Sequence, residues 1–377
     1  MFTKSFSFLL FYKEKYVFYY STILFALTLP LSRAAVSFFI IWFLLLFIIR
    51  RDYAYTWKYI KQNRVFHAMG SLFGLLLLSI LWSENTSEAL NQIRLYSYWI
   101  IIPILASNLK KEWIPNIITA FLLGMFISEV IAYGIFFEWW TFKGRSPEYP
   151  SPFMFHIHYS IFLATTSMIL FSRLLSNQYS LQSKFPMALF FLTSTGNLMI
   201  STGRTGQLAF LVAMAVAIII HYRLTIRSLI LFTGLTMTLF MGAYFNINLF
   251  QKRIDQGIND VQQLQLGNFD TSWGLRAAFW IITVDIVKKH PMLGVGIGDY
   301  KQASIEALKT DDHSFSPYTI NWCSNYDYHN QYLMILGQIG LIGFALMVWL
   351  YTELFRLVIR NLDNRLMTSG SISIFFL

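Results

Sequence analysis

The feature that most constrains the fold is a series of long apolar runs separated by short polar segments. Many approach the roughly 20 residues that a helix needs to cross a bilayer. Because they lack the strict alternation of barrel strands, and lipid offers the backbone no hydrogen-bond partners, each span is expected to be a helix. The sequence therefore predicts an all-α polytopic integral membrane protein with spans near 16–31, 34–49, 66–82, 95–106, 117–137, 159–175, 185–200, 207–220, 228–245 and 330–351.

Composition agrees with this fold class and bears on the expected partners. Only 13% of the residues are charged, whereas a soluble domain has about 25%. The net charge of +10 raises the possibility of a nucleic-acid partner, but basic residues of membrane proteins gather in cytoplasmic loops. We therefore expect membrane lipids and no nucleic acid as partners. The single cysteine, Cys323, excludes an intrachain disulfide.

Loop charge predicts the orientation of the spans. With the N-terminus in the cytoplasm, the basic clusters at 50–64, 110–111, 223–227 and 356–365 all fall inside. The chain then divides into nine spans over 1–245, a long outside segment with short helices over 246–328, and a C-terminal membrane part over 329–377. The last seven residues begin another apolar run that is too short to span a bilayer, which leaves open whether the C-terminal helices are truncated.

The outside segment carries a predicted helix followed by a glycine-rich turn. The helix covers 272–289, with Ser272 as a plausible cap and Pro291 soon after its end. The run at 290–299 is rich in glycine but follows a helix rather than a strand, so a dinucleotide-binding fingerprint is not expected. We interpret this run as a tight turn.

Two arginines on the predicted outer face are candidates for binding an anion. Arg204 stands between Gly203 and a second glycine at 206, which would permit close approach of a ligand. Arg276 lies on the aromatic helix of the outside segment. The guanidinium fork suits phosphate oxygens, although each arginine could instead contact lipid head groups. Together they suggest a diphosphate site more strongly than either does alone.

His329 is the candidate base, since histidine titrates near neutrality. It stands where the polar segment meets the last predicted span, and Asp327 could orient it if the loop folds that way. A structural role is the alternative. Asn330 and Tyr332 follow as candidate substrate-binding residues, and glycines at 337, 340 and 343 predict a small-residue face for close helix packing.

Other polar residues are weaker candidates. His156 and His158 flank one residue near an outside junction but have no third ligand at a recognised spacing, so no metal site is expected. Glu129 lies within a predicted span, where charge is costly and function is the default hypothesis. The alternatives are a carboxylate paired with an arginine and a neutral carboxyl group. A solvated loop explains Ser83, Glu84 and Arg94 most simply.

Three ordered motifs resemble one protein family. They are Ser-Thr-Gly-Arg-Thr-Gly at 201–206; Gly-Leu-Arg at 274–276 with Trp280 and the turn at 291–296; and His-Asn-Gln-Tyr-Leu at 329–333 with the later glycines. The early Leu-Trp-Ser-Glu-Asn at 81–85 also fits. The ordered set resembles the O-antigen ligase and Wzy-type polymerase family of bacterial envelope glycosyltransferases. That resemblance implies a GT-C-like membrane fold with about ten to twelve helices and one long periplasmic segment.

The resemblance also implies an activity. Such enzymes move a glycan from undecaprenyl diphosphate to an acceptor on the periplasmic face of the Gram-negative inner membrane. Arg204 and Arg276 would hold the donor diphosphate, and His329 would serve the acceptor. No cofactor is implied. We expect an O-antigen ligase whose acceptor is the lipid A-core. The alternatives are a polymerase or protein O-oligosaccharyltransferase using the same donor and, in another class, a lipid or polysaccharide transporter.

Overall fold

A computed structural model describes residues 16–222, 225–310, 315–328 and 330–360. The candidate base at 329 therefore lies outside the described residues. The chain divides into two compact units, each assembled from separate stretches of sequence. The first unit comprises 1–54, 104–253 and 355–377, and the second comprises 55–103 and 254–354.

The first unit is built from apolar helices. Its helices are Tyr16–Thr28, α2 (Arg33–Arg50), α7 (Ile114–Phe136), α8 (His156–Leu175), α9 (Leu181–Ile200), α10 (Arg204–Tyr222) and α11 (Ile226–Asn246), with the short η3 (Lys111–Trp113) before α7. Among these, α8 packs against both α9 and α10. Capping side chains determine where some of these helices begin. The Ser32 side chain accepts a hydrogen bond from the Ala35 amide at the start of α2, as expected of an N-cap.

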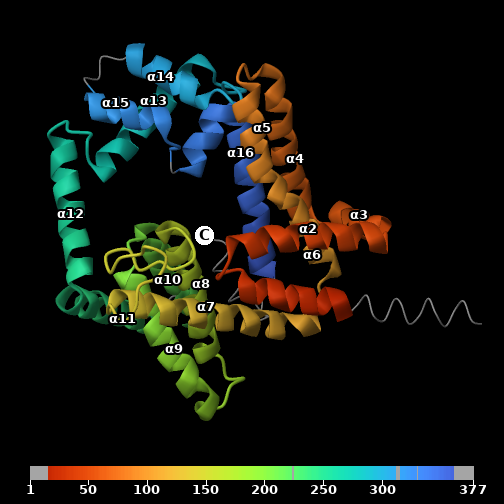
Figure 1. Ribbon diagram of the computed structural model, residues 1–377, viewed down its shortest axis with the longest axis vertical. Coiled ribbons are helices and arrows are strands. Elements are labelled where there is room, and N and C mark those ends of the chain that lie inside the picture. The colour runs from red at the N-terminus through yellow and green to blue at the C-terminus, as the bar shows by residue number, and fades with distance from the viewer. Residues whose placement is uncertain (1–15, 223–224, 311–314, 329, 361–377) are drawn as a thin grey trace, which may run out of the picture. The chain divides into compact units, whose positions relative to one another are not determined.

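The second unit contains two hydrophobic clusters. One joins α13 (Ser272–Lys289), α14 (Tyr300–Thr310) and α15 (Pro317–Asn325) with the start of α16 (Gln331–Arg360). The other joins α4 (Arg64–Leu78) and α5 (Thr86–Tyr96) with a later part of α16. Figure 1 shows α13, α14 and α15 close together, and α4 and α5 beside α16. The division between the units falls within α3 (Tyr53–Gln62), α6 (Ile101–Asn108), α12 (Asn248–Gln265) and α16.

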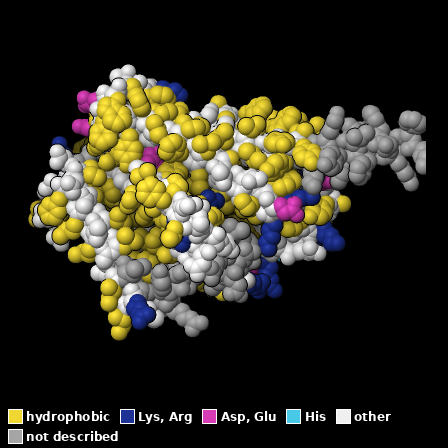
Figure 2. All heavy atoms as spheres, turned by 90° about the horizontal axis from the view of Figure 1, so that it is seen from below, with side chains coloured by type: hydrophobic (Ala, Val, Ile, Leu, Met, Phe, Trp, Pro, Cys, Tyr) yellow, Lys and Arg dark blue, Asp and Glu magenta, His cyan; other side chains and the backbone are white. Residues whose placement is uncertain are grey.

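The fold is that of an α-helical membrane protein. Among the described residues, four helical segments are long and apolar enough to span a bilayer: Arg33–Arg50, Arg64–Trp82, Lys111–Phe136 and Gln331–Arg360. Phe38 and Ile41 of α2 are each 59% exposed, which is the exposure expected of lipid-facing side chains. Hydrophobic side chains also cover much of the face shown in Figure 2. The number of spans remains a prediction.

Two local predictions need correction. The run at 95–106 is not one helix: α5 ends at Tyr96, a 3₁₀ turn η2 (Ser97–Ile100) follows, and α6 then begins. The predicted span over 66–82, by contrast, lies within the candidate span Arg64–Trp82, whose last four residues form a 3₁₀ turn, η1 (Ser79–Trp82). The helix predicted at 272–289 is confirmed, but its cap is Thr271, whose side chain accepts a hydrogen bond from the Gly274 amide 3.1 Å away. Ser272 is the first helical residue.

The last long helix, α16, is interrupted near its middle. Ile339 (φ −133°, ψ 17°) and Gly340 (φ 64°, ψ −161°) leave the helical conformation. The glycine-rich turn satisfies the backbone groups that this break releases. Its amides at Val295 and Gly296 donate to the carbonyls of 337 and 338 at 3.0 and 2.9 Å, and its carbonyls at 291 and 292 accept from the amides of 341 and 342. Such pairing lets broken helices persist where lipid cannot solvate the backbone.

The break in α16 gives Gly340 and Gly343 structural roles that differ from the predicted one. A Cβ at Gly340 would lie 2.4 Å from the Met292 carbonyl oxygen, and a Cβ at Gly343 would meet the side chain of Ile339 at 2.2 Å. The predicted small-residue face for a neighbouring helix is therefore wrong at these two positions. Gly340 makes room for the turn at 291–296, and Gly343 makes room for a side chain of its own helix.

The same turn also holds the start of α5. The Asp299 carboxylate accepts hydrogen bonds from the amides of Glu84 and Asn85 at 2.7 and 2.8 Å. The Gly298 amide donates to the Ser83 hydroxyl at 3.2 Å. The segment at 83–85 is thus tied to 298–299, and its interpretation as a simply solvated loop is wrong for Ser83, which is 8% exposed.

Candidate functional site

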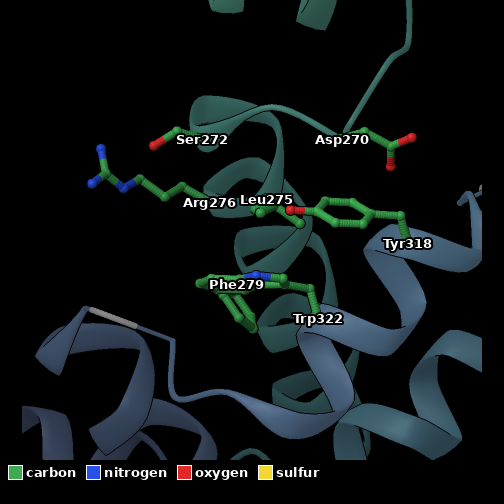
Figure 3. A pocket seen from close by; sticks show the side chains of 7 residues that line it. All are labelled: Asp270, Ser272, Leu275, Arg276, Phe279, Tyr318 and Trp322. Carbon is green, nitrogen blue, oxygen red and sulfur yellow. The ribbon is translucent and has the colours of Figure 1, made fainter.

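A small cavity in the second unit lies between α13 and α15. Its volume is about 250 Å³, and its lining residues are Asp270, Ser272, Leu275, Arg276, Phe279, Tyr318 and Trp322. Figure 3 shows Tyr318 and Trp322 reaching from α15 toward α13, with Asp270 and the guanidinium of Arg276 on opposite sides of the view. The cavity therefore combines aromatic walls with one acidic and one basic group.

Local contacts fix the N-terminal end of α13 beside α15. The carboxylate of Asp270 accepts a hydrogen bond from the Ser316 hydroxyl and another, at 2.7 Å, from the Thr319 hydroxyl. These two hydroxyls hold the pKa of Asp270 below its ordinary value. Gly274 permits close approach here, since a Cβ would lie 2.6 Å from the backbone of Phe269. The chain before Arg276 is thereby anchored to α15.

The segment leading to position 329 packs against the helix that carries Arg276. Tyr328 is 1% exposed, and its ring lies 4.7 Å from that of Phe279 and 5.7 Å from that of Tyr300, measured between centroids. Its hydroxyl is 2.5 Å from that of Ser304. Because Phe279 also lines the cavity, one buried ring connects the cavity to the residue before 329.

Asp327 takes part in a polar network on α14. Its carboxylate accepts a hydrogen bond from the Tyr300 hydroxyl and lies 3.8 Å from the Lys301 ammonium. Lys301 is also 3.3 Å from the Glu88 carboxylate. Burial raises the pKa of Tyr300, and the neighbouring Asp327 carboxylate raises it further, so Tyr300 acts as a hydrogen-bond donor. Whether Asp327 also orients His329 stays a prediction, because 329 lies outside the described residues.

The residues after 329 begin α16. The Asn330 side-chain oxygen accepts hydrogen bonds from the amides of Tyr332 and Leu333 at 2.9 and 3.3 Å, which is the geometry of a helix N-cap. Tyr332 is 48% exposed and its ring faces those of Phe344 and Tyr351. The structure thus gives Asn330 a capping role, while substrate binding by Asn330 and Tyr332 stays a prediction.

Arg204 belongs to the first unit and is the first residue of α10. Its guanidinium donates to the carbonyl of Arg253 at 3.3 Å. The flanking glycines pack against α8: a Cβ at Gly203 would lie 2.1 Å from the Ser160 hydroxyl, and one at Gly206 would lie 2.3 Å from the Ser160 backbone. The two glycines therefore allow α10 to approach α8, and they position Arg204 by packing. They need not serve close approach of a ligand.

Arg253 is a cation that the sequence analysis did not single out. It lies on α12, its guanidinium donates to the Tyr149 hydroxyl at 3.4 Å, and the guanidinium carbon is 5.8 Å from the centre of that ring. Tyr149 also lies 6.3 Å from the ring of His156. A second arginine beside Arg204 strengthens the positive character of this part of the first unit. No sequence motif marks it, because it lies in an ordinary polar helix.

The weaker candidates take different places. His156 and His158 lie in the first turn of α8, and the ring of His156 is 4.1 Å from that of Phe155. Among the described residues, no three His, Cys, Asp or Glu side chains gather where they could hold a metal ion. Glu129, on α7, is 3% exposed. It is therefore buried within the unit rather than facing lipid.

The structure groups some of the predicted site residues and separates others by unit. Arg276 and the segment at 327–330 share the second unit, where Phe279 and Tyr328 link them. Arg204 lies in the first unit. Sequence reasoning missed Tyr318 and Trp322, which line the cavity. It also missed Tyr300 and Lys301, which contact Asp327. The clustering of aromatic residues between 315 and 328 was the available signal.

Part of the chain that carries these residues matches a known protein family. Residues 189–348 match the family model described as O-Antigen ligase, which confirms over this segment the resemblance seen in the motifs. The match covers Arg204, Arg276 and position 329, and it includes the α13–α15 cavity. No curated protein matches the chain.

Proposed function

We propose that this chain, whose residues 189–348 match the O-antigen ligase family, is a glycosyltransferase that joins a polysaccharide to lipid A-core. The donor would be a polysaccharide linked to undecaprenyl diphosphate, used on the periplasmic face of a Gram-negative inner membrane. The observation that carries this proposal is that one family segment contains both candidate arginines and position 329. Apolar helices that place the chain in a membrane support it.

The chemistry requires a leaving group and a base. As the bond from the anomeric carbon to the donor phosphate breaks, negative charge grows on the lipid diphosphate. Guanidinium groups of Arg204 and Arg276 would stabilise that charge as fixed donors. His329 would take the proton of an acceptor hydroxyl while its oxygen bonds to the anomeric carbon. Direct attack inverts that carbon and releases undecaprenyl diphosphate.

A deletion strain tests the proposed function. Loss of all O-antigen from lipopolysaccharide, with lipid-linked polymer accumulating, is the result expected for a ligase. A single repeat unit left on the core would identify a polymerase instead. Unchanged lipopolysaccharide with loss of glycan from secreted or envelope proteins would identify a protein O-oligosaccharyltransferase. Failure of polymer to reach the outer face would identify a transporter.

Arg276→Lys tests the phosphate assignment. Lysine keeps the charge but loses the planar fork that binds two phosphate oxygens. A lost charge-assisted hydrogen bond of about 1.5–3 kcal/mol predicts an approximately tenfold to hundredfold loss of transfer activity. Lys289→Ala, at the exposed far end of the same helix, is the matched control and should retain activity. Normal transfer by folded Arg276→Lys protein would remove Arg276 from the diphosphate site.

Transfer is expected to continue without a divalent cation, because two arginines can supply the positive charge that the leaving group needs. The measurement is transfer by purified enzyme from a lipid-linked donor to a lipid A-core acceptor in excess EDTA. Activity that EDTA abolishes and one added metal restores would contradict this mechanism. Variants of His156 and His158 would then be the next to examine.

A further inference from the structure

We infer that the cavity between α13 and α15 binds the sugar ring joined directly to the donor diphosphate. This inference rests on the proposed function and adds to it a specific site for the first sugar. The cavity is small, about 250 Å³, whereas pockets for drug-sized ligands occupy roughly 300–1,000 Å³. It has room for one ring and not for a long stretch of polysaccharide.

The lining of the cavity matches the chemistry of a neutral sugar. A pyranose presents C–H groups on its faces and hydroxyls around its edge. Tyr318 and Trp322 supply aromatic surface for the faces, while Asp270 and Ser272 supply hydrogen-bonding groups for the hydroxyls. Aromatic residues with a few placed polar groups are typical of small-molecule sites. Tyr318 is 52% exposed, so its ring is accessible to a ligand.

The two charged side chains of the cavity favour one orientation of a bound sugar phosphate. The Asp270 carboxylate repels phosphate, whereas the Arg276 guanidinium attracts it. Both residues line the cavity, and their charged groups lie on opposite sides of the view in Figure 3. A sugar phosphate therefore fits with its phosphate toward Arg276 and its hydroxyls toward Asp270. A lipid head group without a sugar would leave the acidic side of the cavity unused.

The surroundings of the cavity agree with this orientation. Phe279 lines the cavity and contacts Tyr328, the residue before 329. The cavity therefore has Arg276 in its own lining, and a second lining residue, Phe279, contacts the residue that precedes the proposed base in the sequence. In glycosyl transfer the anomeric carbon must lie between the leaving phosphate and the attacking hydroxyl. A first sugar held in this cavity would have its leaving phosphate beside Arg276.

Tyr318→Ala separates binding of the sugar from binding of the diphosphate. The probes are undecaprenyl diphosphate and undecaprenyl diphosphate carrying one N-acetylhexosamine, with affinities measured on purified full-length protein in detergent. We expect Tyr318→Ala to weaken binding of the sugar-bearing lipid by about tenfold, equivalent to about 1.4 kcal/mol. Its affinity for undecaprenyl diphosphate should stay within about twofold of the wild-type value. Tyr318→Phe, which keeps the ring, should restore most of the lost affinity.

Tyr326→Ala provides the matched control. Tyr326 is similarly exposed, at 51%, and stacks on Trp322 at 4.6 Å, but it does not line the cavity. It should leave both affinities near the wild-type values. If Tyr318→Ala weakens both lipids equally, or neither, the sugar site is overturned while the proposed function stands. If wild-type protein binds neither lipid, the proposed function fails and this inference fails with it.

Discussion

Replacement of His329 by alanine is expected to slow single-turnover transfer by about 10²–10⁴ while leaving donor binding near normal, as for loss of a general base. The acceptor hydroxyl must lose its proton as it attacks, and imidazole titrates close to neutrality. The wild-type rate should therefore depend on pH near neutrality, and the variant should lose that dependence where chemistry limits turnover.

Donor binding and transfer must be measured separately to test this role. His290→Ala is the control, since His290 is exposed at the end of α13 and lies outside the proposed site. It should transfer glycan at the wild-type rate. If His329→Ala weakens donor binding but transfers glycan at the wild-type rate once donor is saturating, His329 contacts the lipid diphosphate and is not the base.

Gly340→Ala is expected to destabilise the protein by about 3 kcal/mol or more. The backbone conformation at Gly340 is one that only glycine adopts readily, and a non-glycine residue there costs about 1–3 kcal/mol. An added Cβ would also lie 2.4 Å from the Met292 carbonyl oxygen and 2.7 Å from the Gly294 amide nitrogen. Because both neighbours are backbone atoms, relief requires the turn to move off α16.

Gly337→Ala is the matched control for this prediction. Its Cβ would have Tyr328 as its nearest neighbour at 3.9 Å, an ordinary contact. Alanine at a helical position is also favoured over glycine by about 0.5–1 kcal/mol. Thermal unfolding of both variants in the same detergent makes the comparison. Equal stability of the two variants would show that the break in α16 does not depend on Gly340.

Hydrophobic pattern and helix signals predicted the membrane class and much of the helical content. The apolar runs predicted the first and last residues of α2 and α7 to within three positions. This was possible because a membrane-spanning helix is marked by the apolar composition of its own residues and not by any distant partner. The helix at 272–289 was predicted with its correct bounds. Its cap was assigned one residue too late, since both Thr271 and Ser272 carry hydroxyls and only the backbone geometry selects between them.

The candidate site was predictable in part. A guanidinium between glycines or beside aromatic residues marked Arg204 and Arg276, because the planar fork of this group suits phosphate oxygens. Arg253 carried no local mark, and Tyr318 was marked only by the clustering of aromatic residues between 315 and 328. Their places beside Tyr149 and in the α13–α15 cavity arise from contacts between residues far apart in the sequence.

The sequence by itself determined that this chain enters a membrane, that its elements are helices, and that its motifs resemble those of the O-antigen ligase family. Those properties follow from local composition and spacing. Only the tertiary structure decided that α16 breaks at Gly340, that Asp299 ties 84–85 to the glycine-rich turn, and that Tyr328 links position 329 to the helix of Arg276. Each depends on backbone groups or rings that find partners more than 40 residues away, and a local pattern carries no information about such partners.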